Sequence, residues 1–315
     1  MNPVSALFAA GVWLRNKLYD RGIFKTRRLS RPVVSIGNLS VGGSGKTPFI
    51  ITLGTQLKER GIEFDVLSRG YGRKSSQVAA VDPNGSAEQF GDEPLLIARK
   101  LGMPVVVGAN RYEAGLLAEK NFPQSKLHLL DDGFQHRQLH RDYDIVLIQS
   151  ADFEDTLLPI GKLRERLTAA RRADAIVALP DTPFPAHSSG KPVWHVRRNI
   201  HFLVPMSRVV AFCGIARPQQ FFSGLRKLGM ELADTISFSD HHRYTQRDID
   251  RLLRAKTRSR AQGFITTEKD AINLGPLVAQ LRTFEAASLE LELQDASQAL
   301  DTLLSALEQH CGFRP

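Results

Sequence analysis

The sequence predicts an α/β fold with a mostly parallel sheet flanked by helices, a smaller second α/β domain and an N-terminal amphipathic helix. Two observations support the main part of this prediction. Short runs of apolar and β-branched residues alternate with helical patterns along the chain, as is typical of parallel sheets. A glycine-rich loop joins the first such run to the first long helical pattern. A third observation, a proline-rich stretch over residues 180–192, separates two series of these units and predicts two domains.

Chain length and net charge limit the number of domains and the kinds of partner that we expect. A chain of 315 residues is long enough for two domains. We expect a membrane-associating helix at 1–28, a core domain at 29–192, a linker or hinge at 193–205 and a smaller domain at 206–315. With 42 basic and 33 acidic residues the net charge is +9, which favours nucleic acid, an acidic membrane face or a phosphorylated substrate as partner. The two cysteines, Cys213 and Cys311, form neither a metal motif nor a disulfide framework, which indicates a reducing compartment.

Residues 3–20 are expected to form the amphipathic helix. Its apolar residues recur at helical spacing and are Val4, Leu7, Phe8, Gly11, Leu14 and Leu18, with Trp13 at the edge. The apolar segment is shorter than the roughly 20 residues that span a bilayer, and basic residues follow it rather than precede it, unlike a signal peptide. Such a helix suits an anionic membrane surface, whereas packing against its own domain is the alternative that remains open.

The clearest motif lies between the first strand, expected at 33–36, and the helix after it. The loop consists of Gly42, Gly43, Ser44, Gly45, Lys46 and Thr47. In this context a GxxxxGK[ST] pattern surrounds nucleotide phosphates with backbone N–H groups, while the lysine reaches the β- and γ-phosphates and the Thr47 hydroxyl binds Mg²⁺. Ser40 stands where the first glycine is usual, so Gly42 and Gly43 are expected to supply the flexibility. The sequence therefore predicts a P-loop NTPase-like core that binds ATP or GTP.

Charged residues follow two further strands. Asp131 and Asp132 end the apolar strand that begins at residue 127 and resemble a Walker B element, whose carboxylates hold Mg²⁺ together with Thr47. Arg69 and Arg73 follow the strand at 64–67, at the edge where open α/β sheets bind ligands. A solvated basic turn is the alternative for these arginines.

The remaining elements follow from apolar runs and their boundaries. Further strands are expected at 105–107, 145–148, 175–179, 209–214 and 263–267, and helices near 95–101, 111–120 and 219–228. We also expect a turn at 158–165 leading into a helix that ends at 171–174, a strand pair within 193–204 leading to a hinge near Pro205, and a strand and a last helix within 285–309. Asp92 directly precedes the helix at 95–101, where an N-cap is the common role of an aspartate.

Together these motifs resemble the tetraacyldisaccharide 4'-kinases of lipid A biosynthesis. The matching stretches are SIGNLSVGGSGKTP, LSRGYGRK, GDEP, DDGFQHRQLHRD, PIGKLRE, SFSDHH and TTEKDA, which cover the chain from about residue 30 to 270. The resemblance implies a kinase that uses ATP and Mg²⁺ to phosphorylate the 4'-hydroxyl of a tetraacyldisaccharide 1-phosphate, forming lipid IVA. It also implies a peripheral position on the cytoplasmic face of the inner membrane and a smaller domain that closes over ATP.

The resemblance further implies roles for individual residues. Asp92 matches the aspartate proposed as general base toward the sugar hydroxyl, and His241 matches a histidine that supports it. Lys46 keeps its catalytic role at the phosphates. Arg164 and Glu165 match a pair near the nucleotide and its metal.

Asp131 and Asp132 match the family's paired Walker B carboxylates. Candidates for binding the anionic sugar head, each of which could instead be a surface charge, are Arg69, Arg73, Arg111, His136 and Arg137.

Two other function classes use part of the same sequence. A P-loop switch or metal-insertion NTPase would need the phosphate loop but no lipid. A guanine-specific switch would need Asn/Thr-Lys-x-Asp, whereas Lys269 and Asp270 are adjacent here. A nucleic-acid-stimulated ATPase would place basic residues among aromatics along a groove, which is not the pattern seen. We therefore expect the lipid kinase, with no nucleic-acid partner and no obligate protein partner.

Overall fold

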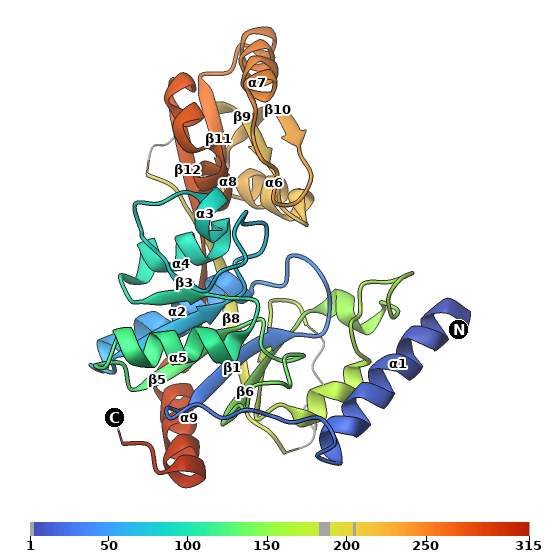
Figure 1. The fold of residues 1–315 in the computed structure, drawn as a ribbon. Helices are drawn as coiled ribbons and strands as arrows, with labels where there is room; N and C mark the ends of the chain where they lie inside the picture. Colours follow the sequence, from blue (N-terminus) through green and yellow to red (C-terminus); the bar gives the residue numbers. More distant parts are fainter. Residues whose placement is uncertain (1–2, 183–189, 204–205, 315) are drawn as a thin grey trace.

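The computed structural model describes residues 3–182, 190–203 and 206–314. Within them, one sheet of twelve strands runs through the molecule, with helices on its faces (Figure 1). Its strands are β1 (Val33–Asn38), β2 (Phe64–Ser68), β3 (Ala79–Ala80), β4 (Val105–Val107), β5 (Leu127–Asp131), β6 (Tyr143–Ile148), β7 (Ala175–Ala178), β8 (Val193–His201), β9 (Arg208–Cys213), β10 (Glu231–Ser237), β11 (Gly263–Thr267) and β12 (Phe284–Leu293). Their order in the sheet is β10-β9-β11-β12-β8-β7-β6-β1-β5-β2-β4-β3. The predicted α/β class is confirmed.

The helices are mostly those that the apolar periodicity indicated. They are α1 (Pro3–Asp20), α2 (Lys46–Glu59), α3 (Ala87–Phe90), α4 (Asp92–Leu101), α5 (Arg111–Asn121), α6 (Pro218–Lys227), α7 (Gln246–Ser259), α8 (Glu268–Leu274) and α9 (Ala296–Cys311), with short 3₁₀ turns η1 (Ser150–Phe153), η2 (Leu167–Arg172) and η3 (Gly275–Gln280). The expected helix ending at 171–174 is thus only the 3₁₀ turn η2. Strand β10 and helix α7 were not anticipated.

The sheet topology brings the sequence motifs to one edge. Strand β1 is buried along its whole length and lies between β5 and β6, parallel to both. Because parallel strands end at the same edge, the loop after β1 and the aspartates after β5 come together there. Strand β2 joins the other side of β5, so the loop beginning at Ser68 reaches the same edge.

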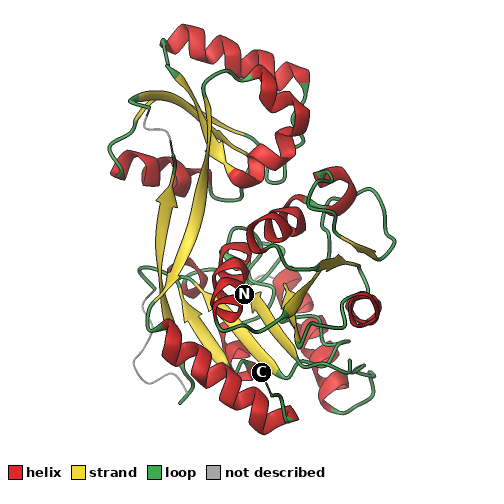
Figure 2. Cartoon of the chain, turned by 90° about the vertical axis from the view of Figure 1, so that its left-hand side faces the viewer, coloured by secondary structure: helices red, strands yellow, loops and turns green. Residues whose placement is uncertain are grey.

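Strands β8 and β12 connect the two parts of the sheet. Strand β8 pairs in parallel with β7 at its start and antiparallel with β12 over the rest, while β12 continues in parallel pairing with β11. These long strands run between the lower and upper parts of the molecule in Figure 2. The strand pair expected within 193–204 is therefore wrong: this segment forms one strand whose partner lies about ninety residues away. The hinge near Pro205 and most of the proline-rich stretch at 180–192 lie outside the described residues.

The C-terminal helix α9 packs on the larger part of the molecule, although it follows the smaller part in sequence. Helix α9 belongs to the same hydrophobic cluster as α2 and the strands around β1, through Ala299, Leu300, Leu303 and Leu307. Separate clusters form around β9 and β11. The division at 1–28, 29–192, 193–205 and 206–315 stays a prediction, and the packing places α9 with the core of the larger part.

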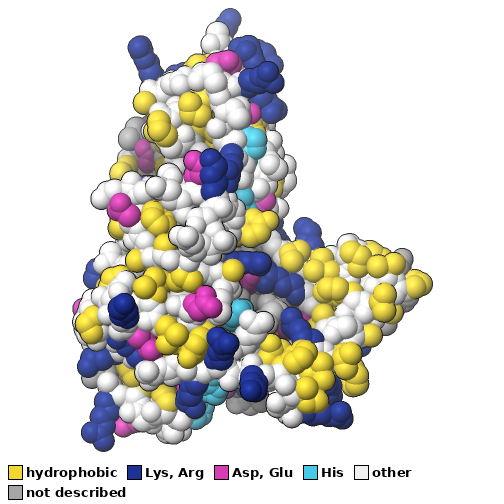
Figure 3. Space-filling view, viewed as in Figure 1, with side chains coloured by type: hydrophobic (Ala, Val, Ile, Leu, Met, Phe, Trp, Pro, Cys, Tyr) yellow, Lys and Arg dark blue, Asp and Glu magenta, His cyan; other side chains and the backbone are white. Residues whose placement is uncertain are grey.

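Helix α1 projects from the body beside the 3₁₀ turns (Figure 1). Phe8 and Ala9 pack against the cluster that contains Leu157 and Leu163. The opposite side is exposed, with Leu7 at 75% and Trp13 at 62% relative exposure. Hydrophobic side chains crowd this projecting part in Figure 3. No helix among the described residues is long and apolar enough to cross a membrane.

Candidate active site

The phosphate loop has the backbone that its glycines predict. Gly42, Gly43 and Gly45 have φ angles of 78°, 46° and 79°, a region that other residues rarely adopt. Ser40 is fully buried and pairs with Leu163 in an isolated bridge, outside the positive-φ stretch. A serine fits there because Gly42, Gly43 and Gly45 make the turn. Helix α2 then starts at Lys46, so its free N–H groups point toward the loop.

Lys46 is held at the loop by neutral and acidic groups. Its Nζ donates to Asn38 Oδ1 at 3.1 Å and lies 3.4 Å from Asp132 Oδ1. Arg164 Nη1 donates to both oxygens of Asp132, at 2.9 and 2.8 Å. Burial raises the pKa of Asp132, but the charges of Lys46 and Arg164 lower it more, so this carboxylate is ionised. The structure thus brings the predicted residues Lys46, Asp132 and Arg164 together.

Asp131 provides a test of whether Mg²⁺ fits. Its Oδ2 accepts a hydrogen bond from Ser68 at 2.7 Å, whereas its Oδ1 is buried without a hydrogen-bond partner among the described residues. Burial and the charges of Glu93 and Asp132 raise the pKa of Asp131 to about 6. Such an orphaned carboxylate oxygen among like charges is where a hard cation is expected. Asp131, Asp132 and the Thr47 hydroxyl all line the same cavity, so the donor set fits magnesium.

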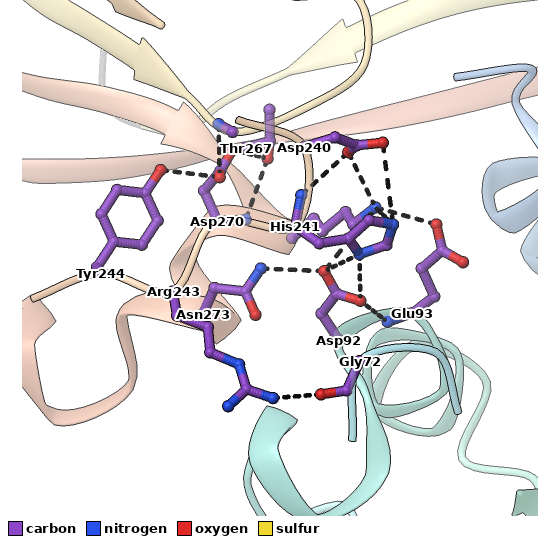
Figure 4. A network of polar contacts seen from close by, with 12 residues as sticks. Gly72, Asp92, Glu93, Asp240, His241, Arg243, Tyr244, Thr267, Asp270 and Asn273 are labelled. Carbon is purple, nitrogen blue, oxygen red and sulfur yellow. Dashed lines mark hydrogen bonds and ion pairs between the residues drawn. The ribbon is translucent and has the colours of Figure 1, made fainter. Parts of the chain in front are cut away.

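A second group of polar residues lies around Asp92 (Figure 4). The carboxylate is 4% exposed and lies at the start of α4, whose N-cap is Gly91 rather than Asp92. His241 Nδ1 lies 2.9 Å from Asp92 Oδ2 and 3.1 Å from Oδ1. Asn273 Nδ2 donates to Oδ2 at 3.0 Å. The structure therefore joins the predicted pair Asp92 and His241 and makes a plain N-cap role for Asp92 untenable.

Lys269 links this group to its neighbours. Its Nζ lies 3.0 Å from Glu93 Oε1, 3.3 Å from His241 Nε2 and 3.8 Å from both Asp92 Oδ2 and Asp240 Oδ1. Burial disfavours its charge, but the carboxylates of Glu93, Asp92 and Asp240 raise the pKa of Lys269 above its usual value. Lys269 is therefore a partly buried ammonium group, 16% exposed, that contacts both α4 and the loop before α7.

The same contacts set the protonation of the pair. Burial raises the pKa of Asp92, but the hydrogen bond from His241 and the charge of Lys269 outweigh it and hold the pKa at about 2. Burial lowers the pKa of His241, yet the hydrogen bond to Asp92 raises it above the usual value despite the opposing charge of Lys269. Asp92 is thus a carboxylate at neutral pH and can accept a proton late in a reaction.

One large cavity joins the two groups. Its volume is about 1230 Å³, and it is lined by the phosphate loop, Asp131, Asp132 and Arg164 on one side and by Glu93, His241 and Lys269 on another. Part of β12, from Ala287 to Leu293, completes the wall. A nucleotide bound at the loop would therefore present its terminal phosphate toward the residues around Asp92.

Comparison with known sequences identifies the family. A model described as tetraacyldisaccharide-1-P 4'-kinase matches residues 1–309. The chain belongs to this family. The tetraacyldisaccharide 4'-kinase of Koribacter versatilis is 50% identical, with 99% of this chain and 100% of the relative covered. The one from Geobacter metallireducens is 40% identical, with 93% of each chain covered.

A solved structure agrees with this membership. The crystal structure of LpxK from Aquifex aeolicus in complex with ATP has a TM-score of 0.80 and 35% identity, and covers 96% of this chain and 97% of that one. This likeness confirms the fold of this family member.

Three further predicted residues lie near one another beside the site. These residues are Arg69, Arg111 and His136. Arg69 lines the cavity, and the positive charges of Arg111 and Arg69 disfavour protonation of the His136 ring. Burial and these arginines lower the pKa of His136 to about 4, so its ring is neutral. Within the part of the chain that the structure describes, His136 Nε2 and Arg111 Nε are buried without hydrogen-bond partners. Unpaired buried polar atoms of this kind mark a place for a polar ligand or water.

The other substrate candidates are placed differently. In residues 3–182, 190–203 and 206–314, Arg73 Nη1 is buried and has no hydrogen-bond partner, and Arg73 is not among the residues that line the cavity. Arg137 donates to Asn16 O at 3.1 Å and Asp20 Oδ1 at 2.9 Å, and its guanidinium lies over the Tyr19 ring. The structure therefore engages Arg137 in holding helix α1.

Glu165 also faces helix α1 rather than the phosphate loop. Its carboxylate accepts from Asn16 Nδ2 at 2.9 Å and pairs with Arg172 at 3.0 Å. Although it follows Arg164 directly, it does not line the cavity. Arg164 contacts Asp132 at the phosphate loop while Glu165 contacts Asn16 of α1, so the structure separates this expected pair.

Sequence reasoning missed several residues of the site. Glu93, Asn38 and Asp240 lie next to predicted residues but had no role assigned. Lys269 lies in the TTEKDA stretch that matches the family, but neither Lys269 nor Asn273, four residues further along the same helix face, had a role assigned. Their partner Asp92 is 181 positions from Asn273, so only the folded chain shows the contact.

Proposed function

We propose that this protein transfers the γ-phosphoryl group of ATP to the 4'-hydroxyl of a tetraacyldisaccharide 1-phosphate, with Asp92 as the group that accepts the hydroxyl proton. The family match over residues 1–309 carries the activity and the substrate class. The phosphate loop and His241 line one cavity, and His241 contacts the buried carboxylate of Asp92, which supports the assignment of roles.

In this proposal one side of the cavity binds the phosphates and the other accepts the hydroxyl proton. The loop N–H groups, Lys46 and Arg164 hold the phosphates and the charge that develops on them. The hydroxyl oxygen bonds to the γ-phosphorus, the bond from that phosphorus to the bridging oxygen of ADP breaks, and the hydroxyl proton passes to Asp92. His241 holds the carboxylate through its Nδ1 contact at 2.9 Å.

Mg²⁺ is proposed at Thr47, Asp131 and Asp132, where the unpartnered oxygen of Asp131 fits a cation. When bound there, Mg²⁺ supplies positive charge beside the β- and γ-phosphate oxygens. Arg69, Arg111 and His136 are proposed to bind polar groups of the sugar head. Arg137, predicted for the sugar head, and Glu165, predicted beside the nucleotide, are not proposed for these roles because both contact helix α1.

We propose that the protein acts at an anionic membrane surface, the cytoplasmic face of the inner membrane. Helix α1 would hold the chain there as a peripheral protein. Exposed Leu7, Trp13 and Leu14 support it, since such side chains are stable in the interface of a bilayer. The basic residues Lys17, Arg21 and Lys25 follow on the exposed end of the helix and suit anionic head groups.

The deciding experiment is a phosphoryl-transfer assay with labelled ATP, Mg²⁺ and a lipid A disaccharide 1-phosphate in detergent. Labelled lipid is expected from the wild type and not from Lys46→Ala, whereas Lys58→Ala, a change of an exposed lysine on the same helix, should retain activity. ATP hydrolysis by the wild type without labelled lipid would reject the kinase in favour of a P-loop NTPase of another kind.

A further inference from the structure

Helix α8 presents two side chains to the Asp92–His241 pair. Lys269 and Asn273 are one turn apart and share a face of the helix. Asn273 Nδ2 donates to Asp92 Oδ2 at 3.0 Å, and Lys269 Nζ lies 3.3 Å from His241 Nε2. Both contacts reach side chains that take part in the proposed reaction, Asp92 and His241. A role for Lys269 and Asn273 therefore rests on the role proposed for Asp92.

The Lys269 contact decides which nitrogen of His241 carries the proton. An ammonium group has donors only, so the 3.3 Å contact from Lys269 fits an Nε2 atom that offers its lone pair. The ring proton is then on Nδ1, which faces Asp92 at 2.9 Å. Burial and the charge of Lys269 oppose a second proton on this ring, although the hydrogen bond to Asp92 raises its pKa overall, and the Lys269 contact favours a neutral ring that donates to Asp92.

Other charges around the ring do not change this conclusion. Asp92 and Glu93 favour a second proton, and Asp240 Oδ2 lies 3.9 Å from Nε2. The Tyr71 ring covers one side, with its centroid 5.1 Å away. A second proton would sit on Nε2 and face the ammonium of Lys269, so it would require Lys269 to leave Glu93.

Asn273 completes the set of donors to the carboxylate. Asp92 Oδ1 accepts from the Glu93 backbone N–H at 2.9 Å, while His241 and Asn273 both reach Oδ2. An ionised carboxylate has about four lone-pair sites. Three donors thus fix the rotation of the carboxylate and leave one site for the acceptor hydroxyl.

We propose that Lys269 and Asn273 are positioning residues of the phosphoryl transfer. Lys269 keeps His241 as an Nδ1–H donor, and Asn273 fixes the plane of the Asp92 carboxylate. The proton from the sugar hydroxyl then stays on Asp92 until the product leaves, because His241 already carries its proton on the side that faces Asp92. His241 orients the base and does not relay the proton.

Nitrogen NMR of the full-length protein with ¹⁵N-labelled histidine tests the first part without substrate. The signals of His241, among nine histidines, are assigned by their loss in His241→Gln. At about pH 7.5 the wild type should show a protonated Nδ1 and an unprotonated Nε2. In Lys269→Met the ring should become doubly protonated or change tautomer.

A matched control separates this role from simple bracing of the helices. Lys100 pairs with Glu268 at 2.6 Å and joins the same helices, α4 and α8. Lys100→Met removes that pair but should leave the His241 shifts at wild-type values. Two protonated ring nitrogens in the wild type, or unchanged shifts in Lys269→Met, would overturn the role of Lys269.

Kinetics test the second part. Lys269→Met and Asn273→Ala should each lower kcat about 10- to 100-fold with little change in the KM for ATP, because they misplace the base rather than the nucleotide. Lys269→Arg, which keeps a donor, should recover part of the loss. An equal loss of kcat in Lys100→Met and Lys269→Met would show that the contact only braces the helices. If Asp92→Asn kept full activity, the proposed base would fail while the NMR result still stood.

Discussion

The Nδ1 atom of His241 lies 2.9 Å from Oδ2 of Asp92, although the two residues are 149 positions apart in the chain. His241 precedes α7 and has a positive φ of 56°, while Asp92 begins α4. Backbone bonds hold the histidine in this unusual conformation, since its N–H donates to Gly214 O at 3.1 Å. The site thus depends on contact between α4 and the segment from β9 to α8.

Replacement of Asp92 by Asn should remove the base while keeping its shape. We expect kcat to fall about 10²- to 10⁴-fold, the usual contribution of a general base, with nucleotide binding retained. Asp82→Asn, in an exposed turn, is the matched control. Full activity of Asp92→Asn would exclude a proton-accepting role.

The pH profile should show that Asp92 is already ionised. Because its pKa is held at about 2, the carboxylate loses its proton far below neutral pH and stays charged as the pH rises. The ratio of wild-type to Asp92→Asn rates should then be constant from about pH 5 to pH 9. A ratio that grows through this range would mean that Asp92 titrates within it.

Magnesium dependence should change with pH through Asp131. Burial and the charges of Glu93 and Asp132 raise its pKa to about 6, so below that pH the carboxyl holds a proton that competes with the metal. The Mg²⁺ concentration for half-maximal activity should rise as the pH falls from about 7 to 5. Asp131→Asn should need more Mg²⁺ at every pH and lose this dependence; a wild type without any pH dependence would contradict the assignment.

Exposed apolar residues of α1 should govern membrane binding. Full burial of such a side chain contributes about 1.5–3 kcal/mol, so Trp13→Glu with Leu14→Glu should sharply reduce co-sedimentation with anionic vesicles. Leu228→Glu, which changes a 53% exposed leucine at the C-terminal end of helix α6, serves as control. Equal binding of both variants would reject α1 as the membrane contact.

Gly37 should be essential for packing beneath the phosphate loop. A Cβ at this position would lie 2.5 Å from Phe134 Cβ and 2.8 Å from its backbone N. Gly37→Ala should therefore lower the free energy of unfolding by about 1–3 kcal/mol, measured in urea. Gly11→Ala, on α1 with no atom within 4 Å, should be neutral or stabilising by up to about 1 kcal/mol.

Local patterns in the sequence determined much of this protein. Strands such as Val33–Asn38 are predicted by their runs of apolar, β-branched residues. The glycine loop before Lys46 binds phosphate through its own backbone N–H groups, so its local sequence is enough to predict it. The aspartates after β5 reach the same edge because parallel strands end together. These features depend on neighbours in the chain, so they could be predicted.

The tertiary structure alone decided which distant residues meet. Pairing of β8 with β12 and packing of α8 on α4 bring Lys269 and Asn273 to Asp92, and no local pattern encodes such long-range contacts. The same holds for Glu165, which the chain places beside Arg164 but the fold turns toward α1. Side-chain partners of this kind depend on how helices and strands pack against one another. The apolar periodicity within one helix or strand does not determine which other element it packs against.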